Sequence, residues 1–319
     1  MESIRLFVSK DEKYFVNLYI DVTLYEKDNT NFTFKKRLGK MKNPYTVCFS
    51  HNGELVAVEN NNNLIEVYNL NSGLRIFKGK GARAWGGNIY FLDDTTLLSS
   101  TYDGMVYTLD ISTGNVVCHF NNRQLRNVEI VEISPSKYLI LGNEIESNTT
   151  SIYSLFFENL LPNIKLLYSA SLALHTRSAC WVNNKLYAVS AAGNELLIYN
   201  INENSNLEVK EECIHILNQS DVVEFTKHAF DIIHQIAPDV ASNLSPSLFP
   251  IGIASAFENK YVIVAFNFGL IVLDVKENKC VSKLPLKAGI SSILVTDKGE
   301  HIWLSSATGL QLISISDII

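Results

Sequence analysis

The sequence predicts an all-β fold built from repeats of a four-stranded antiparallel unit. In residues 45–81, short runs of β-branched and aromatic residues alternate with turn clusters such as His51-Asn52-Gly53 and Asn71-Ser72-Gly73. One such unit cannot bury both of its faces, and the pattern recurs about every 41 residues along the chain. Four strands in a repeat of about 40 residues are typical of a β-propeller. We therefore expect a single propeller domain over residues 1–319.

Seven copies of the unit can be placed in order. They cover residues 3–38, 45–81, 87–121, 125–168, 177–216, 251–286 and 290–316. The third copy carries Asp103-Gly104 between two apolar runs, a strong hairpin signal, and the last copy supplies three strands only. Seven blades is our prediction, and six is the alternative. When the strands are divided into blades in this way, Ile4–Ser9 is the innermost strand of the first blade. We therefore expect the ring to close without a strand exchanged between the termini.

One segment between the fifth and sixth copies breaks the strand pattern. Within residues 218–250 the apolar period changes from two to 3.6, which predicts a helix over 220–237 capped by Ser220 or Asp221. This helix could close over the propeller as a lid or offer a partner its apolar face, with Phe225 and Phe230 in the contact. The alternative is an ordinary insertion whose aromatic residues pack on the propeller.

Composition limits the class of protein. A chain of 319 residues that is 47% hydrophobic can bury a large core. Its five cysteines are an odd number without any C-x-x-C pair, which argues against a disulfide framework and favours a reducing, cytoplasmic location. We find neither the apolar run of a signal peptide nor a membrane-spanning stretch. The net charge of −6 argues against a globally basic nucleic-acid binder.

Two stretches carry a family resemblance. F-S-x-N-G-E-L-V-A-V followed by L-I-E-V-Y-N-L-N-S-G, and S-T-Y-D-G-M-V-Y-T-L-D-I-S-T-G, resemble WD40-type blades, and the chain is similar to a degenerate WD40-like or quinoprotein-like propeller. The Trp-Asp position of that family is occupied here by pairs such as Tyr68-Asn69 and Leu109-Asp110, and the preceding Gly-His dipeptide is absent. Asp103 matches the acidic turn position of the family. The resemblance implies a fold that hosts unrelated functions.

The sequence offers no clear catalytic chemistry. It lacks a G-x-S-x-G nucleophile motif, a glycine-rich phosphate loop and an H-E-x-x-H metal motif, and its seven histidines are scattered over different repeats. We therefore expect no catalytic residues, no metal and no cofactor. A hydrolase or lyase with carboxylates or a metal at the channel mouth is the alternative, because distant blades could bring such groups together.

The links between repeats are cationic in a chain that is acidic overall. If the ring closes, their charges converge on one face and could attract an anionic partner. Our primary hypothesis is therefore a non-catalytic scaffold, monomeric on its own, that binds an acidic protein segment across this face. The candidate partner-binding residues are Arg83, Trp85, Arg123, Arg126, Arg177, Phe225 and Phe230. The alternatives are that these loops are simply polar and that Trp85 packs in the core.

Overall fold

The computed structural model describes residues 5–18, 21–28, 31–60, 62–82, 86–158, 161–201, 209–236, 239, 247–296, 299–306 and 309–319. The chain divides into two compact units, one ending at Thr176 and the other covering Arg177–Ile319. The boundary falls inside the strand β17 (Leu174–Val182), so the sheet that contains this strand is described with the second unit. The prediction of a single domain over residues 1–319 stays a prediction.

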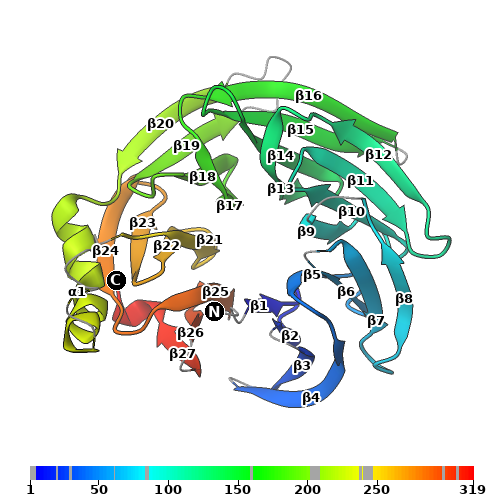
Figure 1. Ribbon diagram of the computed structural model, residues 1–319, viewed down its shortest axis with the longest axis horizontal. Helices are drawn as coiled ribbons and strands as arrows, with labels where there is room; N and C mark the ends of the chain where they lie inside the picture. Colours follow the sequence, from blue (N-terminus) through cyan, green and yellow to red (C-terminus); the bar gives the residue numbers. More distant parts are fainter. Residues whose placement is uncertain are drawn as a thin grey trace. The chain divides into compact units, whose positions relative to one another are not determined.

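The first unit contains four antiparallel sheets of four strands each, called A to D (Figure 1). Sheets A and B consist of β1 (Arg5–Val8), β2 (Tyr14–Leu18), β3 (Asp21–Asp28), β4 (Asn31–Lys40), β5 (Pro44–Phe49), β6 (Leu55–Asn60), β7 (Leu64–Asn69) and β8 (Arg75–Lys80). Sheets C and D consist of β9 (Gly86–Phe91), β10 (Thr96–Thr101), β11 (Met105–Asp110), β12 (Val116–Asn121), β13 (Leu125–Ser134), β14 (Lys137–Glu144), β15 (Thr150–Glu158) and β16 (Leu161–Ala170).

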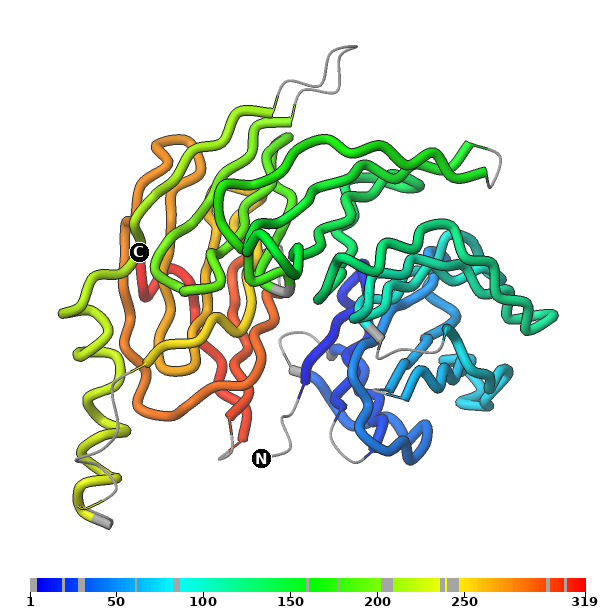
Figure 2. Tube along the Cα trace, turned by 45° about the horizontal axis from the view of Figure 1, so that its top comes forward, coloured from blue at the N-terminus to red at the C-terminus, as the bar shows by residue number. Residues whose placement is uncertain are grey.

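The second unit contains sheets E and F of four strands, sheet G of three strands, and helix α1. Its elements are β17 (Leu174–Val182), β18 (Lys185–Ser190), β19 (Glu195–Ile201), β20 (Val209–His215), α1 (Gln219–Ile236), β21 (Pro250–Ala256), β22 (Tyr261–Phe266), β23 (Gly269–Asp274), β24 (Lys279–Pro285), β25 (Ile290–Thr296), β26 (His301–Ser306), β27 (Gly309–Ser314) and the 3₁₀ turn η2 (Ile315–Asp317). Both Figure 1 and Figure 2 show α1 beside β24.

The repeat assignment made from the sequence is confirmed. The described residues form seven sheets of consecutive antiparallel strands, of which the last has three strands, and helix α1 lies between the fifth and sixth sheets. β1 pairs with β2 from Arg5↔Leu18 to Val8↔Phe15, so the first strand belongs to the first sheet, as predicted. The alternative of six blades is thereby excluded.

Burial explains the two kinds of strand sequence. The central strands β22 and β23 are continuous apolar runs because both of their faces are covered, and every residue of β22 is buried. The fourth strand β24 alternates instead, and its residues are exposed and half-buried in turn. Apolar clusters fill the space between consecutive sheets. Leu24, Val58 and Tyr68, for example, belong to one cluster of sheets A and B.

The turns use the residues that the sequence analysis singled out. Gly53, Gly73 and Gly104 have φ of 70°, 72° and 96°, a left-handed conformation that glycine adopts without steric cost. At the family's Trp-Asp position, Asp110 Oδ1 accepts hydrogen bonds from the backbone N–H groups of Ser112 and Thr113. The residue therefore shapes the turn into the fourth strand. Asp103 acts locally as well, accepting a hydrogen bond from the Thr101 hydroxyl at 2.6 Å.

Candidate functional site

The predicted partner-binding residues are distributed over both units. Arg83 and Trp85 lie outside the described residues. For Arg177 the structure describes the backbone, which belongs to β17. Arg123 and Arg126 lie in the first unit, whereas Phe225 and Phe230 lie on α1 in the second.

Arg123 and Arg126 lie together where β12 passes into β13. We call residues 122–127 the arginine link. The Arg126 guanidinium donates from Nη1 to the carbonyl oxygens of Arg123 at 3.2 Å and Leu125 at 2.9 Å, and the Arg123 side chain is exposed. Within the described part of the chain, neither arginine forms an ion pair with a carboxylate. Both positive charges therefore remain available to an anionic group.

The backbone of the arginine link is held firmly. The Asn122 side chain accepts a hydrogen bond from the Gln124 N–H at 3.1 Å, and the Leu125 N–H donates to the Asn122 carbonyl at 3.0 Å. The buried Leu125 side chain anchors the middle of the link. Asn127 has a φ of 52°, and its N–H donates to the carbonyl of Tyr102 at 2.9 Å.

Tyr102 is an exposed aromatic residue in the turn that contacts the arginine link. It lies in the turn between β10 and β11, and 39% of its surface is exposed. Its backbone contact with Asn127 brings this turn against the arginine link. Aromatic and arginine side chains are enriched at protein-binding hot spots. The sequence analysis missed Tyr102, although the preceding Thr101 and the following Asp103-Gly104 marked the turn.

The lysines in and next to the links between sheets A, B and C are only partly available to a partner. Lys78 Nζ lies 3.1 Å from the carboxylate of the buried Glu66, and Arg75 pairs with the same carboxylate at 3.0 Å. Lys40, Lys42 and Lys80 are exposed. Glu66, a buried acid of strand β7, therefore partly neutralises the positive charge next to the link between sheets B and C.

The helix begins one residue earlier than predicted, and its cap is different. Asn218, and not Ser220 or Asp221, is the N-cap, because its Oδ1 accepts the Asp221 N–H at 3.0 Å. The Asp221 carboxylate in turn accepts the Asn218 N–H at 2.8 Å and pairs with Lys283 of β24 at 2.6 Å. This reciprocal pair is a capping box with Asp in place of Glu. Ser220 only donates its hydroxyl to Asn218 Oδ1.

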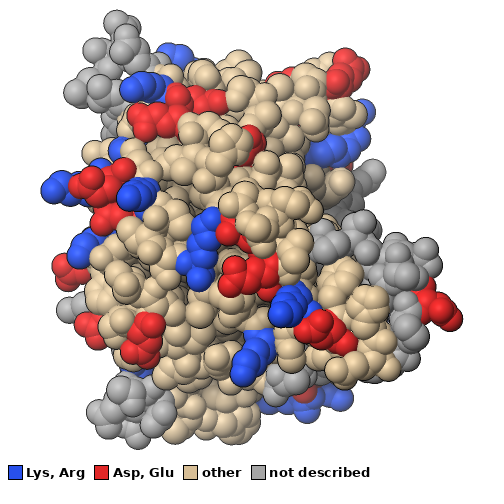
Figure 3. Space-filling view, turned by 90° about the vertical axis from the view of Figure 1, so that its left-hand side faces the viewer, with Lys and Arg blue, Asp and Glu red and all other residues tan. Residues whose placement is uncertain are grey.

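The two aromatic candidates on α1 differ in exposure. Phe225 is 2% exposed and belongs to the apolar cluster of sheets E and F, so its side chain is not at the surface. This placement matches the alternative in which the insertion packs on the propeller. Phe230 is half-buried. In the view of Figure 3, which faces the α1 side, basic and acidic side chains are interspersed over the surface.

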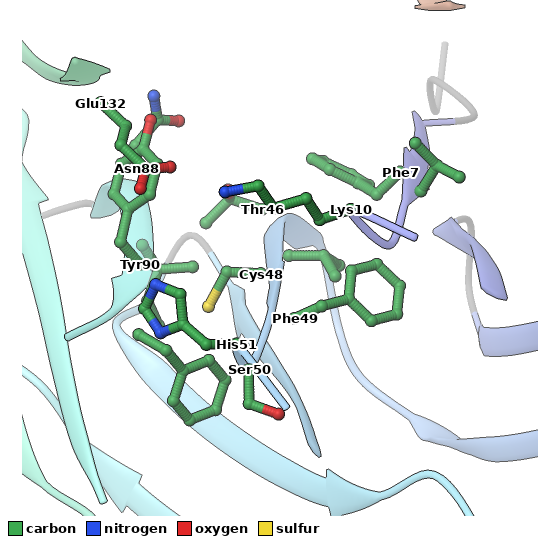
Figure 4. Close-up of a pocket in the computed structure, with 14 residues that line it drawn as sticks. Phe7, Lys10, Thr46, Cys48, Phe49, Ser50, His51, Asn88, Tyr90 and Glu132 are labelled. Carbon is green, nitrogen blue, oxygen red and sulfur yellow. The ribbon is translucent and has the colours of Figure 1, made fainter. Parts of the chain in front are cut away.

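A pocket of about 510 Å³ lies among the first strands of sheets A to D, in the first unit. Its walls are mixed, with apolar residues such as Phe7, Phe49 and Ile89 beside polar and charged ones. Figure 4 shows Lys10 reaching across the pocket beside Thr46, with Asn88, Tyr90 and Glu132 on the opposite wall. Its volume is in the range of small-ligand pockets.

Two polar side chains of the pocket are hydrogen-bonded to the backbone, and burial keeps its cysteine protonated. Tyr90 and Asn88 both donate to the carbonyl of Ile130, at 2.8 and 3.1 Å, and burial raises the pKa of Tyr90. Burial also raises the pKa of the Cys48 thiol well above its usual value, so this cysteine is a poor nucleophile. The Asn88 and Tyr90 side chains thus already donate to the backbone, and the pocket wall contains a protonated thiol.

This pocket was not predicted from the sequence, although the sequence contains a signal for it. Lys10 and His51 occupy the same place in two repeats, the middle of Ser9-Lys10-Asp11 and of Ser50-His51-Asn52. In both turns the serine hydroxyl donates to the third residue, at 2.6 and 2.7 Å. Aligning these turns would have placed the Lys10 and His51 side chains at the same end of the first strands.

The described residues contain no group of three or more His, Cys, Asp or Glu side chains that could hold a metal ion. Nor do they contain a helix both long and apolar enough to cross a membrane.

Comparisons with known proteins identify the fold. No protein-family model matches the sequence, and no curated protein matches it. Among solved structures, the β-propeller domain of Cps50 (Swd1) from Myceliophteria thermophila has a TM-score of 0.72 at 12% identity, covering 98% of this chain and 97% of that one. The WD40 repeats of RRP9 have a TM-score of 0.68 at 12% identity, covering 96% and 88%.

The fold is a seven-bladed, WD40-like β-propeller. The predicted fold class and resemblance are thereby confirmed. Hydrazine synthase of Kuenenia stuttgartiensis is similar as well, with a TM-score of 0.66 at 10% identity over 98% of this chain and 95% of that one. At these identities the WD40-like likeness is one of fold, and function has to be argued from this chain's own residues.

Proposed function

We propose that this WD40-like chain is a non-catalytic protein-interaction scaffold that binds an acidic segment of a partner at the arginine link. WD40 propellers typically serve as platforms for protein contacts, and the fold shared with RRP9 supports this class of function. The observation that carries the proposal is the pair Arg123 and Arg126, two cations on one rigid link without a carboxylate partner among the described residues.

The geometry suits carboxylates. A guanidinium binds a carboxylate through two parallel N–H donors, and such charge-assisted bonds are stronger than neutral ones. The carbonyls of Arg123 and Leu125 hold the Arg126 head group, so less side-chain entropy is lost on binding. Tyr102 adds apolar contact area beside the charges. The preferred segment therefore has two acidic residues next to an apolar one.

Arg83, Trp85, Arg177 and Phe230 stay candidates for contact with the partner in the same proposal. We further propose that the chain is a cytoplasmic monomer. The five cysteines, all described and all free thiols, accord with a reducing compartment.

The test is affinity capture from native cell extract with wild-type protein and an Arg123→Glu/Arg126→Glu variant, at 50 and 500 mM salt. We expect one stoichiometric partner that is lost in the variant and at high salt, because the contact is electrostatic. The captured protein is then cut into overlapping peptides, and binding to the wild type should map to an acidic segment.

A matched control has the same change in charge at other surfaces. Lys165→Glu/Lys210→Glu replaces two exposed lysines of outer strands β16 and β20. This variant should retain the partner, and both variants should melt close to the wild type. Capture that survives in Arg123→Glu/Arg126→Glu, or that fails equally in the control, would move the site away from the arginine link.

A further inference from the structure

The pocket among the first strands of sheets A to D contains two opposite charges that are not paired. All of its lining residues belong to the first unit, and none of them belongs to the arginine link. Lys10 and Glu132 both line it, and neither forms an ion pair with a described residue. A few placed polar groups usually decide which ligand a pocket accepts. These two charges are therefore available to a ligand that carries both signs.

One wall of the pocket offers hydrogen-bond acceptors. The Asn88 amide nitrogen and the Tyr90 hydroxyl both donate to the carbonyl oxygen of Ile130, at 3.1 and 2.8 Å. These bonds leave Asn88 Oδ1 and the Tyr90 oxygen as acceptors on the same wall as the Glu132 carboxylate. Burial and, after it, the charges of Glu129 and Glu132 raise the pKa of Tyr90, so this wall is electronegative. A group with a positive charge and several N–H donors, such as an ammonium, suits it.

The opposite side of the pocket offers hydrogen-bond donors. Lys10 lies in the turn after β1, and Figure 4 shows its side chain reaching across the pocket beside Thr46. The turn is held firmly, because the Ser9 hydroxyl donates to the Asp11 carboxylate at 2.6 Å and accepts the Tyr14 N–H at 2.9 Å. The Lys10 ammonium has three N–H donors and no acceptor, and the Thr46 hydroxyl can donate as well. This side therefore suits a carboxylate.

The rest of the lining is largely apolar. Val47, Ile89 and Phe91 are buried, and Phe7 and Phe49 are half-buried, so three of these five side chains are aromatic rings or their close neighbours in the pocket wall. Apolar contact of this kind supplies much of the affinity of a small ligand, and the polar groups fix its orientation. The volume of about 510 Å³ leaves room for an apolar body in addition to two charged groups.

We propose that this pocket binds a small zwitterion with an apolar body, such as an apolar dipeptide or an aromatic amino acid. The ammonium of the ligand lies against Glu132, Asn88 and Tyr90, and its carboxylate lies against Lys10. Each charged end gives up its hydration on binding, which costs free energy unless the pocket supplies a partner. A ligand with only one charged end leaves one charge of the pocket without its partner, and it binds more weakly. This site is separate from the arginine link and stands independently of the function proposed there.

The probes are L-phenylalanine, L-tryptophan and the dipeptides phenylalanyl-leucine, leucyl-phenylalanine and valyl-phenylalanine. By isothermal titration calorimetry, we expect at least one of them to bind the whole wild-type protein saturably. Acetylation of that probe removes its ammonium, and amidation removes its carboxylate. Each change should weaken binding about tenfold or more, because a charge-assisted hydrogen bond is lost. This comparison of three forms of one ligand uses wild-type protein only, so it does not depend on whether a variant folds.

Two variants assign the two ends of the ligand. Lys10→Met should bind the probe and its amide about equally, and should still prefer the probe to its acetylated form. Glu132→Gln should bind the probe and its acetylated form about equally, and should still prefer the probe to its amide. The matched controls are Lys165→Met and Glu158→Gln, at exposed positions of β16 and β15 in the same unit, which should keep both preferences. All four variants should melt close to the wild type.

Three results would overturn the proposal. The first is that none of the five probes binds the wild-type protein. The second is that the acetylated and amidated forms bind as tightly as the parent probe, because the protein would then recognise only the apolar body. The third is that Lys10→Met and Glu132→Gln both keep the two preferences of the wild type, because the zwitterion would then bind at another site.

Discussion

The Ser99 hydroxyl donates a hydrogen bond to the carboxyl group of Glu59 at 3.0 Å, joining sheets B and C in the interior of the first unit. Glu59 is fully buried, and the Tyr107 hydroxyl approaches its other oxygen at 3.4 Å. Burial raises the pKa of Glu59 from 4.5 to about 8, even though the bonds from Ser99 and Tyr107 act in the opposite direction. Glu59 is therefore mainly protonated at neutral pH.

This buried acid predicts a pH-dependent stability. A carboxyl group whose pKa is higher in the folded than in the unfolded state stabilises folding at low pH and loses that contribution as pH rises, here between 4.5 and about 8. Relative to Glu59→Gln, the wild type should lose roughly 1.4 kcal/mol of unfolding free energy per pH unit across that window. Urea unfolding of both proteins at pH 5, 6.5 and 8 measures the difference. Parallel pH profiles would show that Glu59 does not titrate there.

Glu66 predicts the opposite pH behaviour. Burial alone would raise its pKa, but hydrogen bonds from Tyr68 and Lys78 and the charges of Arg75 and Lys78 outweigh burial and lower the pKa. Its contribution is therefore present at neutral pH and lost as pH falls below 4.5, the ordinary value. Glu66→Gln should cost about 1–3 kcal/mol at pH 7.

Lys78→Met is the comparison for Glu66→Gln. Half of the Lys78 side chain is exposed, so its removal should cost less than about 1 kcal/mol. Thermal unfolding at pH 7 orders the two variants. Equal costs would place the energy in the Lys78 pair and not in the buried carboxylate.

The capping box predicts how α1 is anchored. Asn218→Ala removes the acceptor for the Asp221 N–H and should cost about 1 kcal/mol, whereas Ser220→Ala, which removes no backbone cap, should cost only a few tenths. Hydrogen exchange of the first turn of α1 measures both changes. If Ser220→Ala accelerated exchange as much as Asn218→Ala, the cap would have been assigned to the wrong residue.

The sequence predicted the repeats well because their signals are local. Asp103-Gly104 and Asn71-Ser72-Gly73 fix tight turns through their own backbone preferences, so period and strand count followed directly. The pocket and the pair Ser99–Glu59 depend on contacts between repeats about 40 residues apart, which a local pattern does not contain. The helix cap was misassigned because Asn218, Ser220 and Asp221 all suit that position. Only the geometry distinguishes them.

The contact between Phe225 of α1 and Gly269 of β23 is expected to fix the helix to sheet F. Phe225 is buried, and its ring lies so close to Gly269 that a methyl group at that position would overlap it. Phe225→Ala should cost about 3–5 kcal/mol, the usual loss for a buried phenylalanine. Gly269→Ala should displace the ring and accelerate hydrogen exchange throughout α1 while sheet G keeps its protection. Val223→Ala, at an exposed position of the same helix, is the control and should change neither. If Gly269→Ala left exchange in α1 unchanged, the helix would be held by the Asp221–Lys283 pair and its cap, and the apolar contact would be secondary.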